Sequence, residues 1–398
     1  MRTVLTVLCG LALTVAVGCG PSGQWGRQGQ ADSPLLQEQL LAKADLQVRW
    51  SLQAELEAGE RIDRLFVIDE KLYVLTTTNR LIAIDADGGY YRWIHRAAKR
   101  GKKVFRPTHA DRVQVSEDVP GIEGQMSGAP LREADAFPAV FINTNSYVHM
   151  LNRDTGKLMR EIAFDFSAST PGVSDGDRYY VGSITGLFRC YVLQEGLKLW
   201  KGYTGEVLSA GPQVANTMVY IAGRDAMVRA MYQSDTRESN AWERRVGGPV
   251  VAPFHVDSRA VFIPCTDNRL YAFIPRTGEN FWPNKPSFLT EGPMETGVQV
   301  SARSVFQLAE NDAFYAIDLV SGEQNWSHPD GRDVLAVAGG KVYLRDKDNN
   351  LLIADEVLGD VAATLPMTGI DVIARNTTHP AIWLARSDGR ILCIEPKP

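Results

Sequence analysis

The sequence has few cysteines, and their spacing excludes several kinds of site. Five occur among 398 residues, and no two of them are adjacent or separated by only two residues. Zinc ribbons, haem attachment and thioredoxin-type redox chemistry all need closely spaced cysteines. A disulfide framework is equally unsupported, because the cysteines are scattered through the chain.

Histidine and positive charge are also scarce. The six histidines include no pair at a metal-ligand spacing such as His-Glu-x-x-His, and residues 182–186 only superficially suggest a serine nucleophile motif. The net charge is −5, whereas nucleic-acid-binding proteins usually carry a basic excess that neutralises phosphates. We therefore assign no catalytic, cofactor-binding or metal-binding residue from the sequence, and we expect no cofactor and no nucleic acid partner.

Long apolar runs are missing apart from one at the start of the chain. Residues 4–17 are almost wholly apolar and follow Arg2. A run of about 14 residues is too short to span a bilayer and is typical of a signal peptide. Small residues at 16–18 then precede Cys19, which resembles the lipobox of bacterial lipoproteins. The resemblance implies cleavage before Cys19 and a lipid on its sulfur; the alternative is an ordinary secretory signal with an incidental cysteine.

The segment after Cys19 predicts how such an anchor would be joined to the rest of the chain. Residues 20–32 are rich in Gly, Gln and Ser, which favours a flexible tether. Ser33 and Pro34 before LLQEQLLAKA predict a cap and a short helix. Gly20 stands where Asp often signals inner-membrane retention, so we expect the outer membrane, facing the periplasm. The expected divisions are a signal peptide at 1–18, a tether with a short helix at 19–45 and a repeat region at 46–398.

One strand–turn–strand sequence motif occurs eight times in the repeat region. It begins at Lys71, Ala139, Arg178, Met218, Ala260, Ser304, Lys341 and Ala381. Successive starts are 37 to 44 residues apart, except for the first interval of 68. A period near forty with this unit predicts an all-β, eight-bladed β-propeller. Both faces of each strand are largely apolar, as expected where blades cover one another.

A second signature, Gly-x-x-x-Trp, follows four of the eight hairpins. It ends at Trp93, Trp200, Trp282 and Trp326, and Trp242 keeps the same place without the glycine. Arg160 and Ala363 stand where two further tryptophans would be. The glycine permits a tight turn at positive φ, and the tryptophan can dock between adjacent blades. We therefore predict a structural role for these tryptophans.

The last hairpin has no tryptophan strand after it, and an unassigned one precedes the first hairpin. This is the segment Leu46-Gln-Val-Arg-Trp50. We predict that it completes the last blade and closes the ring, which removes two free sheet edges. Cys190 and Cys393 share a repeat position with small residues such as Ala83, so we expect both to be buried small side chains rather than reactive thiols.

The phrase Asp-x-x-Thr/Ser-Gly-x-x-x-Trp resembles the repeat of PQQ-type β-propellers over about residues 46–398. That family includes quinoprotein dehydrogenases and the outer-membrane assembly lipoprotein BamB. The dehydrogenases are usually longer, and many have adjacent cysteines and calcium ligands that this sequence lacks. The resemblance to BamB implies a non-catalytic scaffold that docks on the β-barrel assembly complex.

The repeat is interrupted once, between Arg96 and Ala136, by about 28 extra residues. The interval begins with six cations, namely Arg96, Lys99, Arg100, Lys102, Lys103 and Arg106. We predict one long surface excursion at 96–136 on one face of the ring, with these cations as a candidate protein-binding loop. The alternative is a solvated insertion without a partner.

These observations favour a lipid-anchored propeller that acts as a scaffold for protein–protein interaction, with BamB-like participation in outer-membrane β-barrel protein assembly as the specific hypothesis. Two alternatives stay open: a PQQ-dependent enzyme similar to the quinoprotein dehydrogenases, and a periplasmic ligand-binding or sensor propeller. Fold alone does not choose among them.

Overall fold

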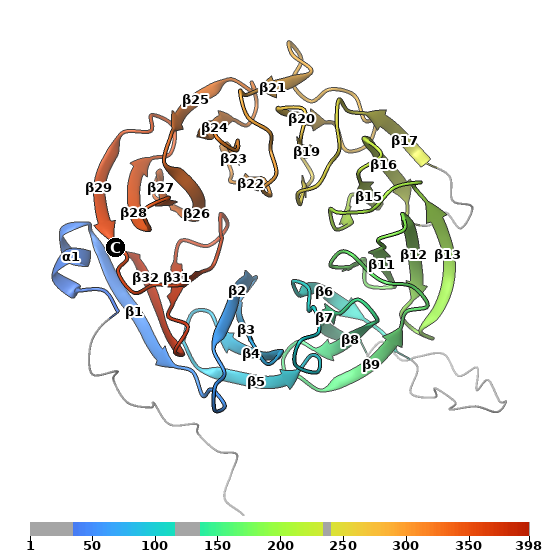
Figure 1. Ribbon diagram of the computed structural model, residues 1–398, viewed down its shortest axis with the longest axis horizontal. Coiled ribbons are helices and arrows are strands. Elements are labelled where there is room, and N and C mark those ends of the chain that lie inside the picture. Colours follow the sequence, from blue (N-terminus) through green and yellow to red (C-terminus); the bar gives the residue numbers. More distant parts are fainter. Residues whose placement is uncertain (1–34, 116–135, 234–239, 398) are drawn as a thin grey trace, which may run out of the picture.

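The computed structural model describes residues 35–115, 136–233 and 240–397, which form a ring of eight four-stranded antiparallel sheets around a central axis (Figure 1). The predicted all-β, eight-bladed propeller is confirmed. The expected signal peptide at 1–18, the expected lipidation site Cys19 and most of the tether lie outside the described residues.

Each blade runs from an innermost to an outermost strand. Blade 1 contains β2 (Ile62–Ile68), β3 (Lys71–Thr76), β4 (Arg80–Asp85) and β5 (Tyr91–Arg96). Blade 2 contains β6 (Thr108–Val113), β7 (Phe137–Asn143), β8 (Tyr147–Asn152) and β9 (Leu158–Ala163). Blade 3 contains β10 (Val173–Ser174), β11 (Arg178–Gly182), β12 (Leu187–Val192) and β13 (Leu197–Tyr203). Blade 4 contains β14 (Gln213–Ala215), β15 (Met218–Ala222), β16 (Met227–Tyr232) and β17 (Asn240–Arg245).

The second half of the ring repeats this order. Blade 5 contains β18 (His255–Val256), β19 (Val261–Cys265), β20 (Arg269–Phe273) and β21 (Ser287–Leu289). Blade 6 contains β22 (Gln299–Val300), β23 (Ser304–Leu308), β24 (Phe314–Asp318) and β25 (Gln324–His328). Blade 7 contains β26 (Gly331–Ala338), β27 (Lys341–Asp346), β28 (Asn350–Asp355) and β29 (Val361–Pro366). Blade 8 contains β30 (Val372–Ile373), β31 (Ile382–Ala385), β32 (Arg390–Pro396) and β1 (Leu46–Gln53).

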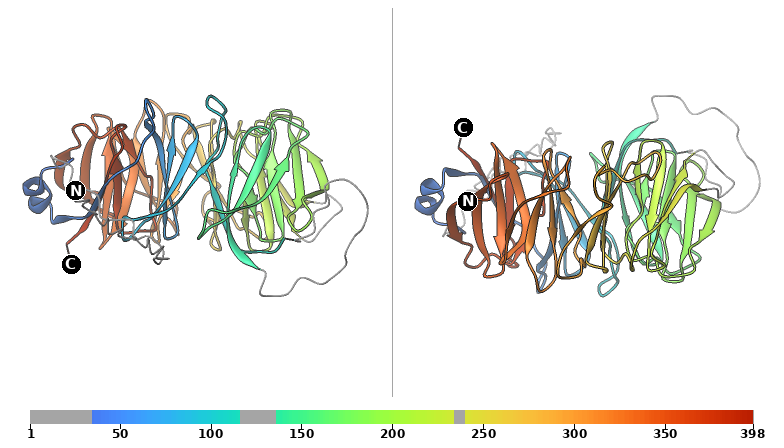
Figure 2. Two further views of the ribbon diagram at one scale, coloured as in Figure 1. Left: turned by 90° about the horizontal axis from the view of Figure 1, so that it is seen from below. Right: turned by 90° about the horizontal axis from the view of Figure 1, so that it is seen from above.

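The alternation of strand direction sorts the loops onto two faces. The loop between the second and third strands and the connector to the next blade lie on one face, as residues 77–79 and 97–107 do. We call this the connector face. The turns after the first and third strands, such as 69–70 and 86–90, lie on the other, which we call the turn face. The edge-on views show the two faces as the opposite sides of a disc (Figure 2).

The ring is closed as predicted, by the N-terminal strand. β1 pairs antiparallel with β32 from Leu46↔Pro396 to Gln53↔Arg390, which brings Trp50 opposite Cys393. The helix α1 (Glu38–Lys43) lies on the outside of the rim beside β29 (Figure 1). Its Leu41 is 1% exposed and packs in one apolar cluster with Leu365 and Ile370 of the neighbouring blades. The last blade is therefore held by both ends of the chain.

The tryptophans dock across blade boundaries. A Cβ on Gly322 of blade 6 would lie 2.4 Å from the Cδ2 of Trp282 in blade 5, so the indole lies flat on the next blade's glycine turn. The Trp282 indole N–H also donates to the carbonyl of Leu319 in that turn, at 3.0 Å. Trp93 repeats the arrangement on Gly156. The recurring glycine thus makes room for the tryptophan of the preceding blade, and not for the tryptophan four residues later in the sequence.

This arrangement explains both exceptions in the repeat. Arg160 covers Gly196 in place of an indole and donates to the carbonyl of Gln194 at 2.9 Å. A tryptophan at position 363 would have no glycine turn to pack on in blade 8. The fourth strand of that blade is β1, which comes from the start of the described chain, so no turn joins it to β32. Ala363 instead packs on the apolar cluster that includes Leu41 of α1.

The repeat position shared by Cys190, Cys393 and Ala83 lies on the third strand of each blade, between the second and fourth strands. Cys190 pairs with Tyr180 on one side and Trp200 on the other, as Ala83 pairs with Tyr73 and Trp93. Cys190 is fully buried, and this burial raises the pKa of its thiol to about 12. Cys393 occupies the same position between Trp50 and Trp383, and burial raises the pKa of its thiol to about 12 as well.

Candidate functional site

The most distinctive surface of the ring is the connector from β5 to β6, residues 97–107, which we call the basic connector. Some of its side chains are buried against the blades, and others are exposed to solvent. The buried members are Ala97, Ala98, Val104, Phe105 and Pro107, and the exposed cations are Lys99, Arg100, Lys102, Lys103 and Arg106. The buried residues pin the loop to the blades, so the cations are displayed from a supported backbone.

The backbone of the basic connector is held by side chains from both flanking blades. Asn79, at φ 64°, donates from one amide nitrogen to the carbonyls of Lys99 and Lys102, each at 2.9 Å. The Tyr147 hydroxyl donates to the Ala97 carbonyl at 3.0 Å, and Arg64 donates to the Val104 carbonyl at 2.8 Å. A surface fixed in this way loses little conformational freedom when a partner binds.

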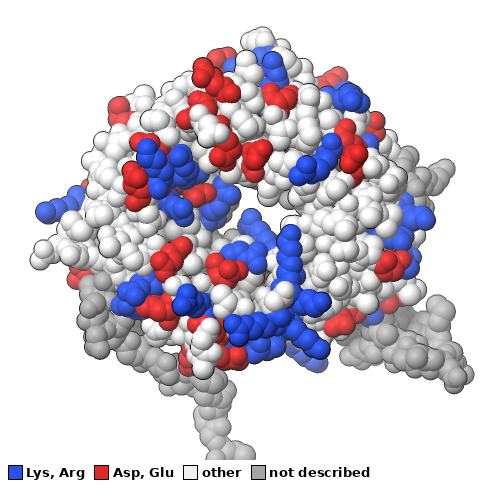
Figure 3. Space-filling model, in the orientation of Figure 1, with Lys and Arg blue, Asp and Glu red and all other residues white. Residues whose placement is uncertain are grey.

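The six cations predicted as a candidate protein-binding loop differ in whether they have an acidic partner. Arg96, the last residue of β5, lies 2.8 Å from the Glu57 carboxylate. Among the described residues, no carboxylate forms an ion pair with any of the other five predicted cations. Figure 3 shows basic side chains gathered at the lower edge of the central opening, over the region of β5 and β6. The structure therefore separates Arg96 from the remaining candidate residues.

Arg106 lies at the mouth of the central channel. It precedes β6, an innermost strand, and its side chain is solvent-exposed. Partial desolvation by neighbouring protein atoms, with a smaller repulsion from Arg375, lowers the pKa of the Arg106 guanidinium. Arg375 follows the innermost strand β30 and is held by Asp333, with Nε 2.8 Å from Oδ1. The positive charge of the connector thus extends to the channel.

The expected single excursion at 96–136 is wrong. The interval contains β6, a complete innermost strand of blade 2, which pairs with β7. Because β6 runs from one face of the ring to the other, the basic connector before it lies on the connector face, whereas β6 ends at Val113 on the turn face (Figure 2). Residues 116–135 lie outside the described part of the chain. β6 was not predicted from the sequence, because the strand's residues, Thr-His-Ala-Asp-Arg-Val, show little alternation of apolar and polar side chains.

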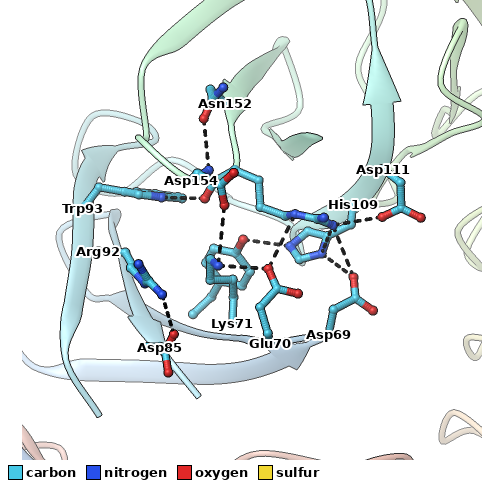
Figure 4. Close-up of polar contacts among 12 residues, drawn as sticks. Asp69, Glu70, Lys71, Asp85, Arg92, Trp93, His109, Asp111, Asn152 and Asp154 are labelled. Carbon is cyan, nitrogen blue, oxygen red and sulfur yellow. Dashed lines mark hydrogen bonds and ion pairs between the residues drawn. The ribbon is translucent and has the colours of Figure 1, made fainter. Parts of the chain in front are cut away.

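A dense polar cluster joins blades 1 and 2 on the turn face (Figure 4). His109 of β6 is at its centre, with Nδ1 2.7 Å from the Asp69 carboxylate and Nε2 2.7 Å from the Tyr73 hydroxyl. Arg153 lies 3.2 Å from Asp111 and 3.5 Å from Asp69. The hydrogen bond from His109 is the main reason that the pKa of Asp69 is lowered.

The Asp69–His109–Tyr73 chain has the order of a proton relay, but its end is sealed. Tyr73 is 0% exposed, and burial raises the pKa of its hydroxyl well above the ordinary value. Burial likewise lowers the pKa of His109. A substrate cannot reach the tyrosine oxygen without opening the interface, so this cluster is suited to tying the two blades together.

A histidine pair, His95 and His149, supports the basic connector through Tyr147. His95 Nε2 is 2.9 Å from His149 Nδ1, and His149 Nε2 is 2.8 Å from the Glu161 carboxylate. Tyr147, which holds the connector carbonyl, stacks on the His149 ring with centroids 4.7 Å apart. The pair therefore supports the loop that displays the cations.

This pair should make the fold sensitive to mild acid. Burial, with a smaller repulsion from His149, lowers the pKa of His95 to about 4, against about 6.5 when unfolded. The unfolded chain therefore binds more protons between these values, so stability is lost as pH falls through the window. We expect the urea midpoint to fall between pH 7.5 and pH 5.0, and to fall less in His95→Gln. An identical pH dependence in the variant would contradict this assignment.

The described residues offer no other clear chemical site. They contain no group of three or more His, Cys, Asp or Glu side chains that could hold a metal ion. None of the helices within them combines the length and apolar character needed to cross a membrane.

Comparison with known proteins identifies the family. A model described as "Outer membrane protein assembly factor BamB" matches residues 144–285 and 266–382, which together make up more than half of the chain. The outer membrane protein assembly factor BamB of Nitrosomonas eutropha (strain DSM 101675 / C91 / Nm57) is 25% identical over 192 residues, covering 46% of this chain and 45% of that protein. The match therefore spans less than half the length of this curated relative.

Two solved structures share the fold. BamB from Moraxella catarrhalis has a TM-score of 0.62 at 15% identity, covering 88% of this chain and 97% of that chain. The computationally designed protein Ika8 has a TM-score of 0.62 at 12% identity, covering 88% and 99%. These likenesses concern the fold alone. Together with the family match, they confirm the predicted relationship: the chain belongs to the BamB family of PQQ-like β-propellers.

Proposed function

We propose that this protein is a non-catalytic scaffold in outer-membrane β-barrel protein assembly, and that it binds a protein partner through the basic connector. Family membership supports the general role. The observation that carries the specific one is the set of cations without acidic partners, displayed from a backbone that Asn79, Tyr147 and Arg64 hold in place. Such a surface favours an acidic patch on a folded protein, because complementary charge steers encounter and fixes orientation.

We further propose that the protein is attached to the outer membrane, facing the periplasm, by a lipid on Cys19. The described chain begins at Leu35, whose side chain packs with α1 on the rim near blades 7 and 8. An anchor at Cys19 would therefore be joined to the ring at its rim. Cys19→Ser should move the protein from the membrane fraction to the soluble periplasm; retention in the membrane would contradict the anchor.

Reversing charge on the basic connector should weaken partner binding. In the triple variant Lys99→Glu, Lys102→Glu and Lys103→Glu, we expect recovery of the barrel-assembly complex from detergent-solubilised membranes to fall about tenfold, because the charge complementarity is lost. The measurement is quantitative pull-down with the intact protein as bait. The histidine pair and the backbone contacts of the loop are untouched by these changes.

The matched control is an equal charge reversal on the turn face. Lys157, Arg276 and Arg303 are exposed there, in turns that follow a first or third strand. Replacing all three with Glu should leave recovery within about twofold, since these residues lie on the face opposite the basic connector. Equal recovery by both triple variants would remove the basic connector from the proposed docking role.

A further inference from the structure

The basic connector has a counterpart of opposite charge on the same face. The connector from blade 5 to blade 6, residues 290–298, is four connectors further round a ring of eight, and so lies diametrically across the central channel. Both connectors are flanked by the loops between the second and third strands of the adjoining blades. The two regions are therefore equivalent parts of the repeat, and their charges can be compared directly.

The charges of the two regions are fully separated. The loops 77–79, 97–107 and 144–146, which we call the basic side, contain the five cations of the basic connector and no carboxylate. The loops 266–268, 290–298 and 309–313, the acidic side, contain five carboxylates and no cation. The five are Asp267, Glu291, Glu295, Glu310 and Asp312. Figure 3 shows acidic side chains above the central opening and basic ones below it.

The acidic side is as firmly built as the basic side. Asn268 donates to the Glu291 carbonyl at 2.9 Å, as Asn79 does to the basic connector. Asp312 accepts hydrogen bonds from the Glu291 N–H and the Tyr315 hydroxyl, both at 2.9 Å. Asp267 has one buried carboxylate oxygen without a hydrogen-bond partner among the described residues. No described Lys or Arg forms an ion pair with any carboxylate of the acidic side.

From this arrangement we infer that the connector face binds one folded protein domain whose own surface is divided, with an acidic patch over the basic side and a basic patch over the acidic side. This inference rests on the proposed function and specifies its partner surface. The partner spans the mouth of the channel, and the reversed orientation is excluded because it would place like charges together.

A uniformly charged ligand does not fit this face. A bilayer of anionic lipids or a strand of nucleic acid would be attracted to the basic side and repelled by the acidic side. Such a ligand would also bind more tightly when the acidic side is neutralised. A partner with one acidic and one basic patch would bind more weakly when either side is altered, because it loses favourable contacts in both cases. Whether altering the acidic side strengthens or weakens binding therefore distinguishes a uniformly acidic ligand from such a partner.

The test compares reversals on each side. The variants are Lys99→Glu with Lys102→Glu and Lys103→Glu, Glu291→Lys with Glu295→Lys and Glu310→Lys, and the two sets combined. Association with the purified barrel-assembly complex is measured in detergent at several salt concentrations. We expect each set to slow association about tenfold at low salt, with the difference shrinking as salt rises. The combined variant should be slower still. Unchanged thermal unfolding would show that the variants fold.

Four results would overturn the inference, and they are distinguishable. Faster association of the acidic-side variant would indicate a uniformly acidic ligand. Binding of the unaltered protein to vesicles containing anionic lipid, abolished by the basic-side variant, would indicate a membrane surface. Normal association of both variants would leave the general scaffold role in place but remove the connector face, including the basic connector, from docking. If the unaltered full-length protein does not bind the complex at all, the proposed function fails and the oriented docking fails with it.

Discussion

A chain that begins at residue 54 should fail to form a stable ring. It lacks α1 and β1, so β32 keeps β31 but loses its outer antiparallel partner along the whole strand, from Pro396 to Arg390. It also loses Leu41 and Leu46, each 1% exposed. Burial of a leucine contributes about 1.5–3 kcal/mol, and a domain is stable by only about 5–15 kcal/mol. We expect loss of a cooperative thermal transition and exposure of an aggregation-prone sheet edge.

The matched control begins at Leu35 and keeps both elements. Its unfolding transition should resemble that of the full-length chain, as measured by circular dichroism and by urea titration. Adding a peptide of residues 35–53 to the truncated protein should restore the transition, because the peptide supplies the missing strand. A truncated protein that unfolds cooperatively at the normal temperature would show that the seam between β1 and β32 does not hold the ring.

Replacing Trp282 with alanine should lower the free energy of unfolding by about 3–5 kcal/mol, the usual range for a fully buried aromatic residue. Trp282 is 1% exposed and lies on the Gly322 turn. Gly322→Ala should destabilise by about 2–5 kcal/mol, since it adds overpacking to the strain of a Cβ at φ 70°. Urea unfolding measures both changes.

Gly340→Ala separates packing from backbone strain. Gly340 has nearly the same φ, 75°, but a Cβ there meets nothing within 4 Å. We therefore expect only the backbone cost, about 1–2 kcal/mol. In addition, Gly322→Ala in the Trp282→Ala background should cost little more than Gly340→Ala, because the indole that it would strike is absent. Equal costs for Gly322→Ala and Gly340→Ala would mean that the docked indole does not constrain the turn.

The sequence predicted the blades because each is encoded locally, within about forty residues. It also predicted that Trp50 completes the last blade, because one strand was missing at one end and unassigned at the other. It did not predict which tryptophan each glycine contacts. Gly322 is four residues before Trp326 in the sequence, but the indole that packs on it is that of Trp282 in the preceding blade. Spacing within one repeat cannot reveal a contact that crosses to the next.

The candidate site could be predicted only in part. The cations of residues 96–106 are visible in the sequence, but the ion pair between Arg96 and Glu57 joins residues 39 positions apart. The face on which the loop lies depends on β6, a strand with little apolar pattern. The acidic side is spread over three loops between Asp267 and Asp312. Only the closed ring places those loops together, opposite the basic connector.

The seam in blade 8 also sets an order of events in time. Gln47 of β1 donates to Glu395 of β32, a partner 348 positions later in the chain. Whenever the chain enters a compartment N-terminus first, β1 arrives well before β32. During that interval the other blades can form from neighbouring segments, whereas β1 cannot pair in its native place. We therefore expect ring closure to be the last step of folding, and the delay before closure sets how long an open sheet edge is exposed to other chains.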